Sequence, residues 1–236
     1  MTAFPSRLPD DLDDLDVIRS HDWKSFSSLD RMQNHWARPE WPSGRRAYYW
    51  MLPFDGTDLV QLAKQCQARL EDPRFDLVPL DALHLTVGRV GFTEQVAAEV
   101  ATTTADAARK RCLRLSPFKV EIGPLAGSRG ALRFSVSPWS SLFPMHQALA
   151  DAVRDVVGDR AHMNTRYFRP HLSIAYANTD VAVRPLLPMI DELRDLPPVT
   201  AAVSEVALVE LRREGTVYRF DTLLSVSLGS GPTVSA

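Results

Sequence analysis

The chain has 236 residues, 45% of them hydrophobic, which is enough to bury the core of one large domain or of two small lobes. The formal net charge of −2 argues against an extended, sequence-independent grip on long nucleic acid, because proteins of that class carry a basic excess. The two cysteines make no disulfide framework, no signal peptide is visible and no apolar stretch is long enough to cross a bilayer, so we expect a cytoplasmic protein without a membrane partner.

Residues 1–46 show weak periodicity, and we interpret them as an N-terminal extension that wraps the core near a cleft. Apolar residues at helical spacing within 12–18 indicate one short helix. The segment 36–42 contains two prolines and is predicted to be a loop. His21 and His35 are interpreted as surface or loop histidines, because a single histidine outside a longer motif is weak evidence for a functional site.

Regular structure is predicted to begin at residue 47, with an aromatic-rich strand. Strands and helices then alternate, each identified by its spacing of apolar residues. The expected elements are a strand over 47–53, a helix over 57–70, strands over 75–80 and 83–90, a helix over 93–111 and a strand over 118–122.

A second series of elements follows two turn signals rich in glycine. Its second helix is expected to be irregular, because Pro185 and Pro188 interrupt it. The expected elements are a strand over 131–137, a helix over 141–157, a strand over 171–177, a helix over 180–193 and a hairpin of strands over 203–211 and 217–228, followed by a tail over 229–236.

A four-residue pattern of histidine, apolar residue, hydroxyl residue and β-branched residue occurs twice, in matching strands. The copies are His84-Leu85-Thr86-Val87 and His171-Leu172-Ser173-Ile174. Side chains at i and i+2 of a strand share a face, so each strand presents an imidazole and a hydroxyl on one face and buries its apolar residues on the other. Of the six histidines, only these two have Ser or Thr two positions later.

The same offset, 171 − 84 = 87 residues, aligns other elements of the two series. It maps the helix at 141–157 onto 54–70, the helix cap at 180 onto 93 and the strand at 205–209 onto 118–122. We therefore predict a duplicated α+β fold over 47–228, with lobes at about 47–125 and 130–228. The fold is expected to be bilobal, with two antiparallel sheets covered by outer helices, related by a pseudo-two-fold and facing a central cleft.

Two imidazoles on opposite sides of a substrate suit in-line displacement at phosphorus. One takes a proton from the incoming oxygen and the other gives one to the leaving oxygen, which suits histidine because its ordinary pKa lies near neutrality. The hydroxyls of Thr86 and Ser173 can bind the phosphate oxygens. Neither copy has a carboxylate, cysteine or second histidine at ligand spacing, so we expect no metal and no cofactor.

With these residues and the repeat, the chain resembles the 2H phosphoesterase superfamily over residues 45–228. The resemblance is to the branch of 2′-5′ RNA ligase-like proteins and 2′,3′-cyclic phosphodiesterases. It implies a bilobal fold and metal-independent action on 2′,3′-cyclic phosphates or 2′-5′ linkages. By position, it implies that His84 and His171 are the acid–base pair and that Thr86 and Ser173 bind phosphate. The extension at 1–46 has no counterpart in the minimal family fold.

Other residues are weaker candidates. Arg169, just before the second motif, and Tyr48 and Trp50, which share one face of the first strand, are candidate substrate contacts, although core packing is the alternative for the two aromatic residues. Strict alternation places Arg89 and Tyr176 on the faces opposite the histidines. We also interpret His146 as a surface residue and Cys66 as a small core residue.

The leading hypothesis is a monomeric phosphoesterase whose partner is a nucleotide or RNA end carrying a phosphodiester. His171 is assigned the base role and His84 the acid role in hydrolysis. Two alternatives remain open. One is a non-catalytic module that binds phosphate or nucleotide in the same cleft, and the other is an enzyme of this fold that acts on a specialised metabolite.

Overall fold

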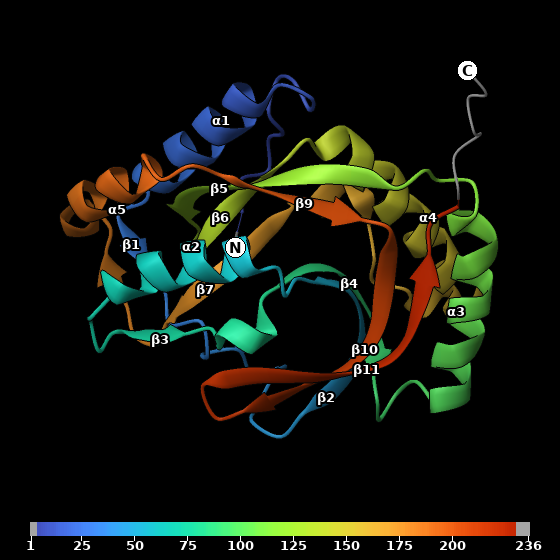
Figure 1. Cartoon of the computed structure of the whole chain (residues 1–236). Coiled ribbons are helices and arrows are strands. Elements are labelled where there is room, and N and C mark those ends of the chain that lie inside the picture. The colour runs from blue at the N-terminus through green and yellow to red at the C-terminus, as the bar shows by residue number, and fades with distance from the viewer. Residues whose placement is uncertain (1–3, 230–236) are drawn as a thin grey trace, which may run out of the picture.

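A computed structural model describes residues 4–229, so the tail predicted at 229–236 lies outside the described residues apart from Gly229. Five α-helices are present in this range (Figure 1). They are α1 (Leu15–Ser27), α2 (Thr57–Ala68), α3 (Ala98–Cys112), α4 (Trp139–Val157) and α5 (Leu187–Arg194). None of the helices in this range is both long and apolar enough to span a membrane.

The same range contains eleven strands, most of them in one antiparallel sheet. They are β1 (Arg31–Met32), β2 (Arg46–Pro53), β3 (Phe75–Leu77), β4 (His84–Phe92), β5 (Phe118–Gly127), β6 (Ala131–Ser137), β7 (His171–Ala177), β8 (Val181–Ala182), β9 (Val199–Val203), β10 (Glu205–Glu214) and β11 (Val217–Ser227). The predicted α+β class, with antiparallel strands and outer helices, is confirmed.

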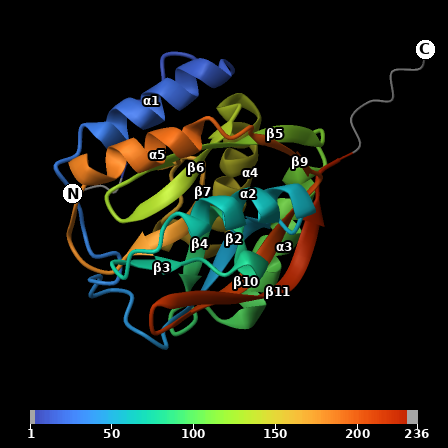
Figure 2. The ribbon, with the colours of Figure 1, turned by 60° about the vertical axis from the view of Figure 1, so that its left-hand side comes forward.

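The main sheet has the order β11-β10-β2-β4-β7-β6-β5-β9, with β3 paired to β7 beside this path. Its two halves meet where the motif strands β4 and β7 lie side by side, and Leu85 opposite Leu172 is the pair that joins them. The two predicted sheets are therefore two halves of one curled sheet (Figures 1 and 2). The pseudo-two-fold between the halves stays a prediction.

The last strand or hairpin of each series along the chain pairs with strands of the other series. Strand β5 closes the first series but pairs with β6 and β9 of the second. The hairpin β10–β11 closes the second series but pairs with β2 of the first. Each half of the sheet therefore contains strands from both halves of the sequence, and the closing strands tie the halves together.

The predicted helix over 180–193 is wrong in its first half. Residues 181–182 form β8, which pairs with β1 of the N-terminal extension, and α5 begins only at Leu187. Pro185 and Pro188 explain the late start, because proline is accommodated in the first turn of a helix but not in its interior. The strand β9, before the predicted hairpin, was not expected at all.

The N-terminal extension is ordered around α1, which begins inside the segment 12–18 where a short helix was expected but continues to Ser27. The carboxylate of Asp14 caps it by accepting hydrogen bonds from the backbone N–H groups of Asp16 and Val17. Phe26 of this helix packs so closely on β5 that a Cβ at Gly127 would lie 2.3 Å from its ring. Helices α1 and α5 lie side by side in both views (Figures 1 and 2), so the extension is part of the packed fold.

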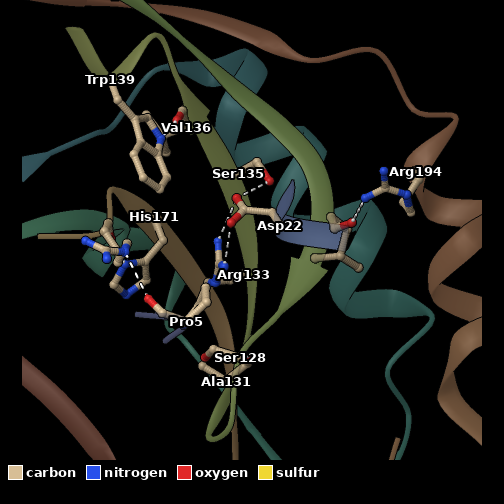
Figure 3. Close-up of polar contacts among 12 residues, drawn as sticks. Pro5, Asp22, Ser128, Ala131, Arg133, Ser135, Val136, Trp139, His171 and Arg194 are labelled. Atoms are coloured by element: carbon tan, nitrogen blue, oxygen red, sulfur yellow. Dashed lines mark hydrogen bonds and ion pairs between the residues drawn. The ribbon is translucent and has the colours of Figure 1, made fainter. Parts of the chain in front are cut away.

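A buried ion pair joins α1 to the centre of the sheet. The carboxylate of Asp22 accepts hydrogen bonds of 2.9 and 3.1 Å from the guanidinium of Arg133 and one of 2.7 Å from the Ser135 hydroxyl (Figure 3). Burial opposes ionisation of Asp22, but the charge and hydrogen bonds of Arg133 and Ser135 outweigh it and lower the pKa of the carboxyl below its ordinary value. Both charged side chains are almost fully buried.

Replacing Asp22 with alanine is expected to lower the free energy of unfolding by about 3–5 kcal/mol, because Arg133 is left charged and unpaired inside the protein. Urea denaturation at pH 7 measures the effect. Asp106→Ala, which removes an exposed ion pair with Arg109, is the control and should cost at most about 1 kcal/mol.

The difference between wild type and Asp22→Ala should shrink as the pH falls below 3.8, the ordinary value for aspartate, because a carboxyl with a lowered pKa loses its contribution on protonation. A cost no larger than that of Asp106→Ala would contradict this role for the buried pair.

Candidate active site

The four motif residues that were expected to share a cleft line one cavity of about 260 Å³. His84 and His171 are the first residues of β4 and β7, and Thr86 and Ser173 follow on the same faces. Their apolar neighbours, such as Leu85 and Leu172, are fully buried on the other side of the sheet. The geometry predicted from strand alternation is therefore present at the start of both strands.

The two imidazoles are held by the same backbone contact. Nδ1 of His84 lies 2.8 Å from the carbonyl oxygen of Ala82, and Nδ1 of His171 lies 2.7 Å from that of Arg169. A carbonyl only accepts hydrogen bonds, so Nδ1 carries the proton in both rings. In the neutral form, Nε2 of each ring is then the nitrogen with a free lone pair.

Both histidines are easier to deprotonate than a histidine in water. Burial lowers the pKa of His171 to about 4, and the nearby charge of Arg133 acts in the same direction. Burial also lowers the pKa of His84. Each ring packs against one phenylalanine, with centroid distances of 4.6 Å from His171 to Phe4 and 5.3 Å from His84 to Phe220.

The prediction that Arg89 faces away from His84 is wrong, because β4 contains a bulge. Thr86 and Gly88 pair with consecutive residues of β2, so Val87 is one extra residue between them. An extra residue reverses the alternation beyond it. Arg89 therefore lines the same cavity as His84 and Thr86.

The same correction applies to Tyr176 in the second motif strand. Ser173 and Ala175 pair with consecutive residues of β6, and Ile174 is the extra residue between them. Tyr176 thus lines the cavity with Ser173. Burial raises the pKa of Tyr176 to about 12, so its hydroxyl stays protonated. Arg89 and Tyr176 are separated by the same 87 residues as the two motif histidines, and so are the two bulge residues Val87 and Ile174.

The three weaker candidates for substrate contact lie elsewhere. Trp50 and Tyr48 are buried in the hydrophobic core, and their neighbour Tyr49 lines the cavity instead. Aromatic residues lie on both faces of β2. The alternation of side chains along this strand therefore could not show which of the two faces lines the cavity. Arg169 is buried and donates to the backbone carbonyls of Pro5 and Ser6 and of two residues of its own segment, which holds residues 5–6 beside the second motif.

His35 contradicts its interpretation as a plain loop histidine. It lines the cavity, its ring stacks on Tyr176 at 4.1 Å, and its Nε2 lies 3.1 Å from the hydroxyl of Tyr218. Burial, together with the charges of Arg38 and Arg213, lowers its pKa to about 2, so this ring is neutral. No periodicity in 1–46 pointed to it, because its position depends on contacts with distant strands.

His146 is not a surface residue either. It is buried, its Nδ1 lies 2.8 Å from the hydroxyl of Thr165, and its ring stacks on Phe168 at 4.4 Å. It lies outside the cavity walls and holds the loop before the second motif against α4. Cys66 is confirmed as a core residue, and burial raises the pKa of its thiol to about 12.

Removing one phenylalanine should change the titration of one histidine only. In Phe4→Ala, the His171 ring becomes more hydrated, so its pKa should rise from about 4 toward the ordinary 6.5 while that of His84 is unchanged. Phe220→Ala is the matched variant and should raise the pKa of His84 instead. NMR titration of the imidazole carbon-bound protons measures both values, and equal shifts of both histidines in either variant would contradict the pairing.

The comparisons with known proteins agree with this geometry. The family model described as "2'-5' RNA ligase superfamily" matches residues 57–215, which include both motifs. No curated protein sequence matches the chain.

Several solved structures share the fold. LigT of E. coli in complex with 3′-AMP is 18% identical, covers 79% of this chain and 99% of its own, and has a TM-score of 0.54. TT0787 of Thermus thermophilus is 20% identical, covers 79% and 98%, and has a TM-score of 0.56. ATU0111 of Agrobacterium tumefaciens, titled a conserved protein of unknown function, is 14% identical, covers 78% and 87%, and has a TM-score of 0.55.

At these identities the structural likeness establishes a common fold, and the family model covers well over half of the chain. With paired histidine motifs on adjacent strands of that fold, the chain belongs to the 2′-5′ RNA ligase superfamily, among the 2H phosphoesterases.

Proposed function

We propose that the protein hydrolyses phosphodiesters of nucleotides or RNA ends, with 2′,3′-cyclic phosphates as the first substrate class and 2′-5′ linkages as the second. One observation carries this proposal. Two histidines with the same Nδ1–carbonyl contact share one cavity with two hydroxyl side chains. The nucleotide and phosphate in structures of E. coli LigT support a ligand of this class.

In the proposed reaction, Nε2 of His171 takes a proton from water as the water oxygen attacks phosphorus. The bond from phosphorus to one ribose oxygen breaks on the opposite side, and Nε2–H of His84 gives its proton to that leaving oxygen. The product is a ribose phosphomonoester with one free hydroxyl. Each of the two proton transfers typically contributes a factor of about 10²–10⁴ to the rate.

The charges around His171 support its role as the base. Burial lowers the pKa of His171 to about 4, and the nearby charge of Arg133 acts in the same direction, so the ring is neutral at pH 7. His84 has no cation among the causes of its lowered pKa. An anionic phosphate between the rings favours protonation of an imidazole, and we assign that proton to His84.

Hydroxyl and guanidinium groups on the cavity wall are suited to the negative oxygens of the substrate. Thr86 and Ser173 can donate hydrogen bonds to the non-bridging oxygens, as the motif pattern predicts. Arg89 lies beyond Thr86 on the same wall and carries a charge that neutralises the phosphate. Tyr176 occupies the corresponding place beyond Ser173 and is neutral, so the two ends of the cavity differ in charge.

His84→Ala and His171→Ala should each reduce kcat on a ribonucleoside 2′,3′-cyclic phosphate by about 10²–10⁴ or more, because each variant loses one proton transfer. Steady-state release of the phosphomonoester measures the loss. His162→Ala, at an exposed position outside the cavity, is the control and should retain wild-type activity. Near-normal turnover by either motif variant, with folding verified by circular dichroism, would exclude the proposed mechanism.

The pH dependence of kcat/KM should be bell-shaped with its maximum on the acidic side of neutrality. The base must be deprotonated, so activity rises through the His171 value of about 4. The acid must be protonated, so activity falls as the pH passes the lowered pKa of His84, which lies below 6.5. The profile of kcat should lie at higher pH, because bound phosphate raises both values. A kcat/KM that keeps rising above pH 7 would contradict this assignment.

A further inference from the structure

A second cavity, of about 440 Å³, adjoins the first one and is built largely by the N-terminal extension. We call the first the motif cavity and the second the side cavity. The two share the walls formed by His35, Arg38, Glu40 and Gly130. Arg129, in the turn between β5 and β6, lines the side cavity and not the motif cavity.

Backbone hydrogen bonds fix the walls of the side cavity. The N–H of Gln33 donates to the carbonyl of Arg129 at 2.5 Å, and the N–H of His35 donates to that of Ala177 at 2.7 Å. His35 lies so close to the turn that a Cβ at Gly130 would be 3.2 Å from its Nδ1. The extension is thus held against the turn and the end of β7, beside the second motif.

The two arginines of the side cavity lack anionic partners. Within residues 4–229, Arg38 contacts Nδ1 of His35 at 3.3 Å but no carboxylate, and Arg129 has no side-chain hydrogen bond or ion pair. Many other arginines among the described residues pair with acids, although Arg213 binds only backbone carbonyls. These pairs include Arg45–Glu94, Arg46–Glu210, Arg212–Asp221 and Arg219–Asp81. Glu40 is the one carboxylate among the lining residues, so two cations face one anion.

We propose that the side cavity is a second anion subsite, in which Arg38 and Arg129 bind a phosphate on the 5′ oxygen of the nucleoside whose 2′,3′-cyclic phosphate occupies the motif cavity. The inference rests on the proposed function for the placement of the cyclic phosphate. The 2′, 3′ and 5′ oxygens belong to one ribose, so a single nucleotide can place its cyclic phosphate in the motif cavity and its 5′ phosphate in the adjoining side cavity. Guanidinium groups suit the second phosphate because they donate paired hydrogen bonds to its oxygens.

Equilibrium binding tests the subsite without requiring turnover. Calorimetry compares adenosine 2′-monophosphate with adenosine 2′,5′-bisphosphate on wild type, Arg38→Ala, Arg129→Ala and Glu40→Gln. Wild type should bind the bisphosphate at least about tenfold more tightly, since one charge-assisted hydrogen bond contributes at least this much. The ratio of the two affinities should fall toward one in both arginine variants and rise in Glu40→Gln, which removes the opposing charge.

Arg109→Ala, in α3 and outside both cavities, is the matched control and should keep the wild-type ratio. Equal affinities of wild type for the two ligands, or an undiminished ratio in both arginine variants, would overturn the subsite whatever the enzyme hydrolyses. Absence of hydrolysis of every cyclic phosphate would instead overturn the proposed function and leave the binding result standing.

Measurements of kcat/KM then show whether the 5′ phosphate belongs to an RNA end or to a free nucleotide. The substrates are a nucleoside 2′,3′-cyclic phosphate, its 5′-phosphorylated form and a dinucleotide that ends in the cyclic phosphate. A higher kcat/KM for both extended substrates than for the nucleoside supports an RNA end, and a higher value for the 5′-monophosphate alone supports a free nucleotide. No preference for either over the nucleoside would overturn the subsite as part of the active enzyme.

Discussion

The pairing of β4 with β7 is the constraint on which the rest of the structure depends. Only Leu85 and Leu172 are in register between these strands, and this contact joins the two halves of the sheet. Each leucine is buried below the sheet, so the neighbouring residues, including His84 and His171, face the cavity together. If these strands separated, each motif would remain intact but the two imidazoles would no longer line one cavity.

The second motif is further supported from the N-terminal extension. The Asp22–Arg133 pair joins α1 to β6, and β6 pairs with the second motif strand. Arg133 also lowers the pKa of His171, while Asp22 has the opposite and smaller influence. Phe4 completes this environment by covering the imidazole. The extension therefore contributes to the stability of the fold and to the electrostatics of the site.

The two bulges give the cavity a lining that differs between its two ends. The hydroxyl residues Thr86 and Ser173 are equivalent, but Arg89 at one end is charged and Tyr176 at the other is neutral. The extension stacks the neutral ring of His35 on Tyr176 and adds the charged side chains of Arg38 and Glu40 to the cavity walls. The lining supplied by the two motifs is thus the same at both ends of the cavity, and the bulges and the extension supply the lining that differs.

The sequence by itself determined the α+β class, most strands and helices, and the four motif residues of the cavity, because these follow from local apolar spacing and from strand alternation. Tertiary structure decided the rest. The bulges reversed the faces of Arg89 and Tyr176, since a bulge depends on the partner strand and leaves no local signal. The place of His35 depends on backbone contacts with strands far along the chain. The exchange of closing strands depends in the same way on long-range pairing, which local periodicity does not encode.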